Sequence, residues 1–300
     1  MDENGLYAAH ADMLGSVEKT ANKEVFNWHW TVDIPASDLE SVKMTDVTVE
    51  AAQWRQATPA ADMYFTHAEY YRDGIQHIVD ELQHKPTSNR ALYSLLAQKD
   101  ISKSGDNPIP SFLTFQCSIE KEVLYCTATF RALEVSNFLR INLEEIRQNL
   151  VDICKELPAI EKVHLHIFAF HAYVRSVPAA ALRRPKINVM FMPKLLILMQ
   201  EGDVRELDTL LGEVARSTTA VSEVGLATLL GIFQIEKNAR LHASIEGKRG
   251  LLVPQLMQAV NACKDLASSR KGASRGIYTA EKIRAFQTAV NNVRETLLLK

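Results

Sequence analysis

The sequence has only four cysteines, and they are far apart. Cys117, Cys126, Cys154 and Cys263 form no Cys-x-x-Cys pair. Zinc knuckles and the disulfide frameworks of small secreted domains need closely spaced cysteines, so neither is expected. We therefore predict no metal site and a reducing, cytoplasmic location.

An excess of charge of one sign is also missing. The chain has 34 Lys and Arg against 36 Asp and Glu, a formal net charge of −2. Bulk electrostatics thus gives no reason to expect a nucleic acid or a membrane surface as partner. No apolar run approaches the roughly 20 residues of a membrane-spanning helix. The start, "MDENGLYAAHADMLGS", lacks the basic region and apolar run of a signal peptide. We expect a soluble protein.

Hydrophobic residues, in contrast, are plentiful and patterned. They make up 47% of 300 residues, enough for one large domain or two smaller ones. Aromatic and β-branched residues predict strands at 24–34, 90–98, 162–174 and 187–192, and a hairpin over 111–132 that turns at 120–122. Apolar residues at helical spacing predict helices at 70–83 and 142–157, and residues 1–20 have weaker helical character.

Beyond Pro193 the pattern is helical almost throughout. Near the end of the chain, apolar residues recur at steps of three and four, at Ile283, Phe286, Val290, Val293 and Leu297. A small, basic turn is expected at 268–276 before this stripe. The predicted fold class is α/β (α+β), a mixed sheet with helices over residues 1–195, followed by an all-helical region over 196–300.

The polar residues most able to do chemistry lie in the α/β part. They are Arg90, Ser111, Arg131, Glu134, Asn142 and His166. Arg131 follows an apolar, β-rich run, and a desolvated guanidinium needs an anion, either a carboxylate such as Glu134 or a ligand phosphate. Asn142 and Glu145 have the spacing of a helix N-cap with a capping box. A single histidine on a strand, such as His166, is most often a surface or hydrogen-bonded residue.

Three segments, in one order, carry a resemblance to a known family. They are "GIQHIVDELQHKPTSNRALYSLLAQKDI" (74–101), "PIPSFLTFQCSIEKEVLYCTATFRALEVSNFLRIN" (108–142) and "HLHIFAFH" (164–171). These resemble the motifs of the thymidylate synthase and dCMP hydroxymethylase family. The intervals from Ser111 to Gln116, Arg131, Glu134 and Asn142 match that family's spacing. The resemblance covers about residues 70–190 and implies a thymidylate-synthase-like sheet.

The resemblance also implies roles for individual residues. Arg131 would hold the substrate phosphate within its own subunit, since a guanidinium pairs with phosphate oxygens through parallel hydrogen bonds. Arg90 would reach into the site of a neighbouring subunit, which implies a homodimer. Asn142 would read the edge of the pyrimidine, His166 would lie near the deoxyribose hydroxyl, and Glu134 would replace an aspartate near the base and the folate.

Departures from the family pattern decide the functional prediction. Ser111 stands where the family has its catalytic cysteine, and a neutral serine hydroxyl is a poor nucleophile. The family's folate-side motifs are not found, so folate is expected as a cofactor only if the protein is an active enzyme. We predict a divergent relative that binds a pyrimidine deoxynucleotide such as dUMP without methyl transfer, as a sensor, regulator or scaffold.

Two alternatives stay open. One is an active pyrimidine nucleotide C5-methyltransferase or hydroxymethylase that uses another thiol, Cys117 or Cys126. The other is a structural dimerisation module in which Arg90 and Arg131 pair with protein carboxylates. In the main prediction and in the structural alternative, the helical C-terminal region offers amphipathic surfaces to a protein partner.

Overall fold

The computed structural model describes residues 5–104, 108–175, 183–218, 220–235, 241–272 and 277–299. The chain forms two compact units. Unit 1 comprises Met1–Ala60, Phe65–Ser104 and Ile109–Ala179, and unit 2 comprises Ala61–Tyr64, Gly105–Pro108 and Ala180–Lys300. The predicted class is confirmed, because a mixed sheet with helices precedes a helical C-terminal region. The division expected near residue 195 falls inside unit 2.

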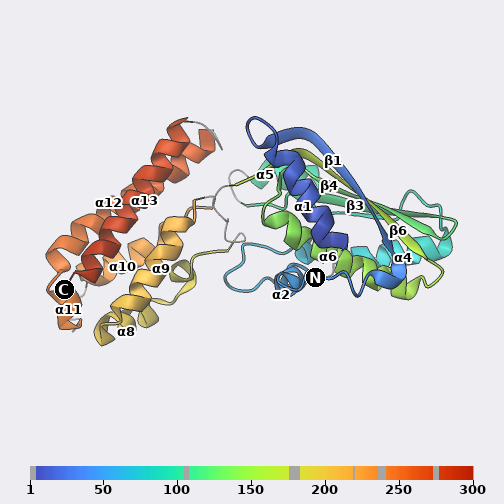
Figure 1. The fold of residues 1–300 in the computed structure, drawn as a ribbon. Coiled ribbons are helices and arrows are strands. Elements are labelled where there is room, and N and C mark those ends of the chain that lie inside the picture. The colour runs from blue at the N-terminus through green and yellow to red at the C-terminus, as the bar shows by residue number, and fades with distance from the viewer. Residues whose placement is uncertain are drawn as a thin grey trace. The chain divides into compact units, whose positions relative to one another are not determined.

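The helices and strands follow one another along the chain as shown in Figure 1. In unit 1 they are α1 (Gly5–Glu18), β1 (Glu24–Pro35), the 3-10 helix η1 (Ala36–Asp38), α2 (Thr48–Trp54), α3 (His67–Tyr71), α4 (Gly74–His84), β2 (Leu92–Ser94), α5 (Gln98–Ser104), β3 (Phe112–Glu120), β4 (Val123–Phe130), β5 (Leu133–Glu134), α6 (Phe138–Glu156) and β6 (Lys162–Tyr173). In unit 2 they are α7 (Lys186–Val189), α8 (Met192–Glu201), α9 (Val204–Arg216), α10 (Val224–Ile235), α11 (Ala243–Glu246), α12 (Arg249–Gly272) and α13 (Ile277–Leu298).

The sheet of unit 1 has the strand order β1-β6-β4-β3-β2, and β5 adds to β6. β4 and β5 run parallel to β6, whereas the other pairs are antiparallel. The parallel pair requires a crossover, and α6 provides it between β4 and β6. Figure 1 shows α1 and α6 running along this sheet.

The two faces of the sheet differ in composition. Along β6, Val163, Leu165, Ile167 and Ala169 are fully buried in the core of unit 1, and the residues between them are only half-buried. By strand register the second face, here called the open face, carries His29, Thr31, Asp33, Thr114, Gln116, Ser118, Tyr125, Thr127, Thr129, His164, His166 and Phe168. Period-2 alternation therefore separates an apolar core from a polar and aromatic face.

Several predicted strands are confirmed. β1 and β6 cover the predicted ranges, and the hairpin of β3 and β4 turns at Lys121 with a φ of 58°. The strand predicted over 90–98 was too long, since β2 ends at Ser94 and the carboxylate of Asp100 accepts a hydrogen bond from the amide of Ala97, which leads into α5. The strand predicted over 187–192 was wrong. A six-residue apolar run fits either state, and Ile187 is buried in the helical core from α7.

The predicted apolar stripe near the end of the chain is confirmed on α13. Phe286, Val290, Val293 and Leu297 are buried in the core of unit 2, and Ile283 packs against it. The turn predicted over 268–276 was wrong for its first part, because α12 continues to Gly272. Residues 273–276 lie outside the described residues. Across the ranges that the structure describes, no helix is both long and apolar enough to cross a membrane.

A buried ion pair connects α6 to the segment before α2. Glu144 is 0% exposed and Arg147 is 5% exposed. Arg147 donates from Nε and Nη2 to the carboxylate of Glu144 at 2.8 Å each, and from Nη1 to the carbonyl of Leu39 at 2.7 Å. The same carboxylate accepts from the amide of Met44 at 2.9 Å. Burial alone would raise the pKa of Glu144, but these hydrogen bonds outweigh it and hold the pKa below its usual value.

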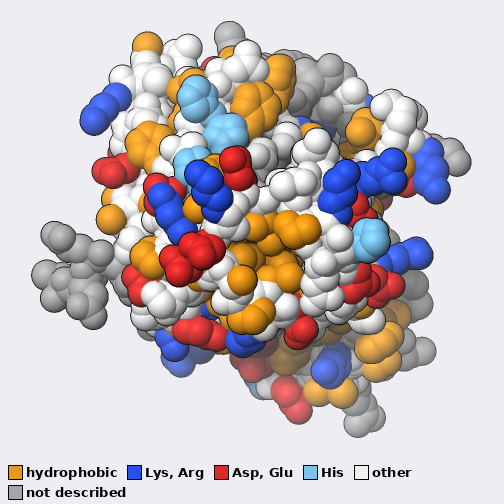
Figure 2. Space-filling view, turned by 90° about the vertical axis from the view of Figure 1, so that its right-hand side faces the viewer, with side chains coloured by type: hydrophobic (Ala, Val, Ile, Leu, Met, Phe, Trp, Pro, Cys, Tyr) orange, Lys and Arg blue, Asp and Glu red, His pale blue; other side chains and the backbone are white. Residues whose placement is uncertain are grey.

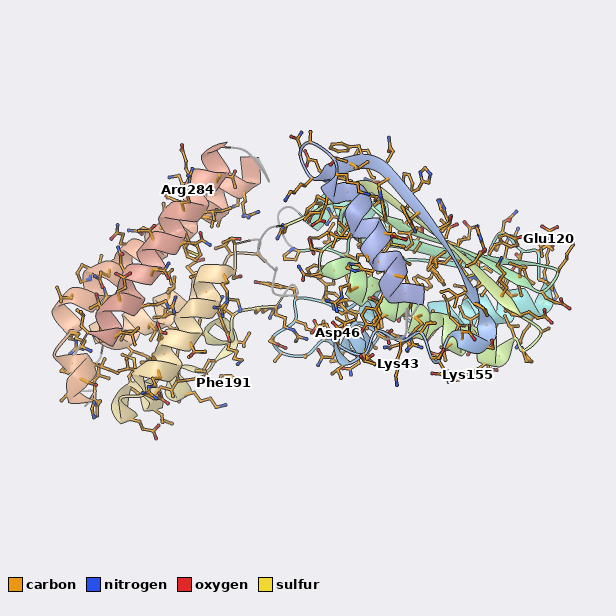
Figure 3. All side chains as sticks on the ribbon, viewed as in Figure 1. Lys43, Asp46, Glu120, Lys155, Phe191 and Arg284 are labelled. Carbon is orange, nitrogen blue, oxygen red and sulfur yellow. The ribbon has the colours of Figure 1, made fainter. Side chains whose placement is uncertain are left out.

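This pair predicts a stability effect that depends on pH. The variant Glu144→Gln should unfold more easily by about 3 kcal/mol at neutral pH, because the buried guanidinium of Arg147 loses its counter-charge. Since the folded pKa is lowered, the contribution of Glu144 is present above its ordinary pKa and is lost as the pH falls through the folded value. Urea unfolding of both proteins at several pH values measures this. The exposed Glu120 (Figure 3) gives the control Glu120→Gln. Equal stability of Glu144→Gln and wild type would contradict the role of the pair.

Candidate functional site

Arg131 lies just beyond β4, and backbone carbonyls orient its side chain. Nε donates to the carbonyl of Pro110 and Nη2 to that of Ile109, each at 3.1 Å. The backbone amide of Arg131 donates to the carbonyl of Ser111 at 2.9 Å. Arg131, just after β4, and Ser111, just before β3, are therefore neighbours, although the whole β3–β4 hairpin separates them in the sequence.

The charge of Arg131 is not neutralised by a neighbouring carboxylate. The salt bridge to Glu134 that was expected as one alternative is not formed, and among the described residues no other carboxylate contacts this guanidinium. Burial lowers the pKa of Arg131, and the Tyr173 hydroxyl opposes that shift. An arginine stays protonated at physiological pH, so the end of β4 carries a positive charge whose hydrogen-bond partners among the described residues are carbonyl oxygens.

The carboxylate of Glu134 is hydrogen-bonded to the backbone at the start of α6. Its carboxylate accepts hydrogen bonds from the backbone amides of Ser136 (2.9 Å), Asn137 (2.9 Å) and Phe138 (3.0 Å), and the residue is 4% exposed. The first amides of a helix have no partner within it, and a carboxylate there also complements the helix dipole. Glu134 thus stabilises the N-terminus of α6.

The expectation that Asn142 caps a helix was wrong. α6 begins at Phe138, so Asn142 lies in its second turn and is 7% exposed. The apolar residues before Asn142 belong to the helix rather than to the preceding strand, because Glu134 provides the cap from four residues upstream. No hydrogen bond from the Asn142 amide to another described residue is found.

Arg90 and His166 lie elsewhere on unit 1. Arg90 is exposed before β2, and its carbonyl accepts from Nε2 of His77 at 3.0 Å. His166 lies on the open face, where its ring centroid is 6.0 Å from that of His29. Burial lowers the pKa of His166, and His29 and His164 lower it further. Figure 2 shows histidine side chains gathered side by side on one part of the surface.

The structure thus brings together Ser111 and Arg131, with Glu134 following on β5. His166 pairs with Thr127 in the middle of β4, away from the strand end that precedes Arg131. Within the described part of the chain, Arg90 and Arg131 do not contact each other. If both serve one phosphate, as the resemblance implies, a second subunit must supply Arg90.

Sequence reasoning missed a buried polar cluster on the core side of α6. Nδ1 of His67 lies 2.7 Å from Oε2 of Glu145, and the other carboxylate oxygen, Oε1, is buried without a hydrogen-bond partner. Burial, and then Glu145, raise the pKa values of Tyr71 and Tyr93. The sequence signal for this cluster was Glu145, a charged residue on the core-facing side of a predicted helix. Helical spacing predicts an apolar residue at such a position.

The cysteines that could replace a catalytic thiol are in the core. The Sγ atoms of Cys117 and Cys126 lie 3.4 Å apart across β3 and β4, and both side chains are buried. Burial raises the pKa of Cys126 well above its usual value, and the contact with Cys117 adds to the shift. A thiol in this state is a weak nucleophile, so the geometry does not favour the active-enzyme alternative.

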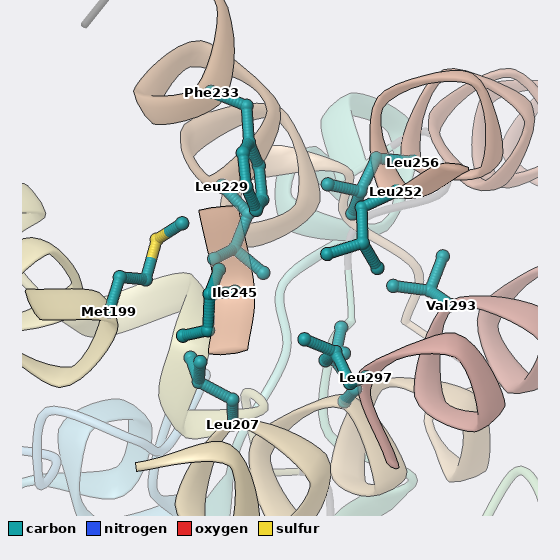
Figure 4. A pocket seen from close by; sticks show the side chains of 10 residues that line it. Met199, Leu207, Leu229, Phe233, Ile245, Leu252, Leu256, Val293 and Leu297 are labelled. Atoms are coloured by element: carbon teal, nitrogen blue, oxygen red, sulfur yellow. The ribbon is translucent and has the colours of Figure 1, made fainter. Parts of the chain in front are cut away.

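The described residues offer neither a metal site nor a ligand-sized cavity. Among the described residues no group of three or more His, Cys, Asp or Glu is placed to hold a metal ion. Unit 2 contains a cavity of about 10 Å³. The side chains that line it are apolar, among them Met199, Leu229, Phe233 and Leu297 (Figure 4). A cavity of this size and lining stays dry and is a packing gap.

Comparison with known proteins identifies no family. No protein-family model matches the chain, and no curated protein matches it significantly. The thymidylate synthase relationship therefore stays a prediction from the motifs around Ser111, Arg131 and Asn142.

If Glu134 stabilises the start of α6 rather than binding a ligand, removing its carboxylate should destabilise the fold. The variant Glu134→Ala leaves three successive amides, those of Ser136, Asn137 and the first residue of α6, without their acceptor, so we expect the free energy of unfolding to fall by about 1–3 kcal/mol. Urea unfolding measures it, with Glu120→Ala at the exposed hairpin tip as the matched control. A variant as stable as wild type would show that Glu134 is not needed by the helix.

Proposed function

We propose that this protein is a cytoplasmic, thymidylate-synthase-like protein that binds a pyrimidine deoxynucleotide such as dUMP and does not transfer a methyl group to it. One observation carries the proposal. The guanidinium of Arg131 is oriented by the carbonyls of Ile109 and Pro110, next to Ser111, and no carboxylate among the described residues contacts it.

An arginine held in this way suits a phosphate. Two of its five N–H donors are used by carbonyls, which fix the plane of the guanidinium without cancelling its charge. The remaining donors can pair with two phosphate oxygens in parallel, and a pre-oriented side chain loses less conformational entropy on binding. The phosphate would supply the missing counter-charge.

The base would be read by Asn142 in this proposal. Asn142 is 7% exposed on α6, and its amide makes no hydrogen bond to another described residue. Such an amide can accept a hydrogen bond from N3–H of uracil through its oxygen and donate one to O4 through its nitrogen. His166, with its lowered pKa, is a neutral donor and acceptor for a sugar hydroxyl.

The absence of methyl transfer is proposed from the chemistry of Ser111. Addition to C6 of the pyrimidine needs an ionised nucleophile, and a serine hydroxyl is not ionised at neutral pH without a dedicated base. A nucleotide site that keeps its anion contact and lacks the thiol fits a sensor, a regulator or a scaffold. Tritium release from 5-tritiated dUMP with added folate would favour the active-enzyme alternative instead.

Calorimetric titration tests nucleotide binding directly. We expect wild type to bind dUMP more tightly than dCMP, because an amide at Asn142 fits uracil, and Arg131→Ala to weaken dUMP binding by about tenfold to a hundredfold. Arg284 in unit 2 (Figure 3) is exposed, so Arg284→Ala removes the same charge as a control and should bind normally. Failure of dUMP, dCMP, dTMP and UMP to bind at millimolar concentration would end the proposal.

We further propose a homodimer whose sites share Arg131 from one subunit and Arg90 from the other. Arg90→Ala and Arg131→Ala should each weaken dUMP binding. In a heterodimer of the two variants, one site contains both altered residues and the other contains neither. Co-expressed, differently tagged subunits should therefore recover wild-type affinity at half of the sites. A monomeric protein in sedimentation, or a mixture without recovery, would contradict shared sites.

A further inference from the structure

A column of aromatic rings lies along β1 and β6, near the end of the sheet where Arg131 is found. The rings of Phe26 and His171 are stacked with centroids 4.5 Å apart, and His171 is stacked on Tyr173 at 5.2 Å. Phe170 meets Phe26 edge to face at 5.6 Å. We call Phe26, Phe170, His171 and Tyr173 the aromatic column.

An irregularity of the backbone exposes the column. Asn27 has a φ of 54°, the left-handed region that is unfavourable for most residues, and Asn27 and Phe170 interrupt the pairing of β1 with β6. Regular alternation would place Phe26 on the same face as the buried Trp28. Instead Phe26 is 58% exposed and Phe170 is 55% exposed. Two large rings are therefore turned to the surface together, at a conformational cost.

Positive charge lies at the Tyr173 end of the column. The guanidinium of Arg175 lies 5.6 Å from the ring centroid of Tyr173, and Arg131 interacts electrostatically with the same residue. The carbonyl of Lys23 accepts a hydrogen bond from the amide of Val174, so the exposed Lys23 lies next to the residue that precedes Arg175. We call Lys23, Arg131 and Arg175 the basic end. The nearby carboxylate of Glu24 is paired with His171 at 3.1 Å.

We propose that the aromatic column and the basic end form a binding site for a single-stranded, pyrimidine-rich oligonucleotide. This rests on the proposed function, because it assigns Arg131 to a phosphate, and it extends the ligand class from a free nucleotide to one within a strand. Exposed rings provide faces on which bases stack, and arginine and lysine neutralise the backbone phosphates. The bases flanking the bound nucleotide stack on Phe26 and Phe170.

The chemistry of this surface favours a nucleic acid over an apolar partner. Protein interfaces are also rich in aromatic residues and arginine, so the rings alone do not select the partner. The cationic residues at the Tyr173 end of the aromatic column favour a polyanion over an apolar surface. The net charge of the chain does not oppose such a local site, since phosphate contacts act within about a Debye length of 10 Å.

Fluorescence anisotropy with a labelled oligo-deoxythymidylate of about 15 nucleotides tests the site in the full-length chain. We expect binding by wild type and a loss of about tenfold or more in the Phe26→Ala/Phe170→Ala double variant. Phe170→Thr alone, which keeps the stacked part of the column, should give a smaller loss. The control is Phe191→Ala, a still more exposed phenylalanine of unit 2 (Figure 3), which should bind as wild type does.

Salt dependence and dUMP separate this inference from the proposed function. Arg131→Ala should weaken both dUMP and the oligonucleotide and should reduce the slope of log affinity against log salt by about 0.7. The double phenylalanine variant should bind dUMP normally. Binding of dUMP without the oligonucleotide would overturn the inference and leave the proposed function standing, whereas failure of both ligands would overturn both.

Two other results would also overturn the inference. One is oligonucleotide binding that the double phenylalanine variant retains in full, which would place the strand elsewhere. The other is a dimer in sedimentation that the double variant dissociates, without oligonucleotide binding by wild type. In that case the aromatic column is a contact between two copies of the chain.

Discussion

The buried pair of Glu144 and Arg147 is the interaction on which the α/β unit depends most. Two charges inside a core are tolerated only when their hydrogen bonds are complete, and here the pair also binds the carbonyl of Leu39 and the amide of Met44. The helix α6 thereby holds the segment 39–44, which contains no helix or strand of its own. α6 is also the crossover between β4 and β6, so the anchored helix follows shortly after the strand end that precedes Arg131.

The start of α6 links that anchor to the candidate site. Glu134 lies three residues after Arg131 and caps the helix through three amides. Glu134 belongs to the short β5, which pairs with β6, so the segment from Arg131 to Phe138 is held along its length. A rigid segment of this kind keeps a guanidinium oriented before any ligand arrives, which reduces the entropy cost of binding.

The sequence predicted the parts of the fold that follow a single period. β1, the β3–β4 hairpin, β6 and the stripe on α13 all alternate or repeat regularly, and their packing follows from that pattern. The start of α6 was misplaced because its cap comes from the side chain of Glu134, and no local pattern indicates which way that carboxylate turns. The acceptors of Arg131, Ile109 and Pro110, are about twenty residues away in sequence and meet it only through the hairpin.

The backbone irregularity at Asn27 is the feature of unit 1 that the sequence predicts least, and its consequence is that two phenylalanine rings are exposed. Nothing in "EVFNWHWTVDI" indicates that Asn27 adopts a positive φ, and regular alternation assigns Phe26 to the core. Strained backbone persists only where the surrounding structure enforces it, and such positions cluster at binding sites. Here the irregularity turns two phenylalanine rings outward beside a cationic strand end. Two large rings exposed side by side are the feature of this sheet that core packing does not explain, and the strand-binding site proposed above gives them a role.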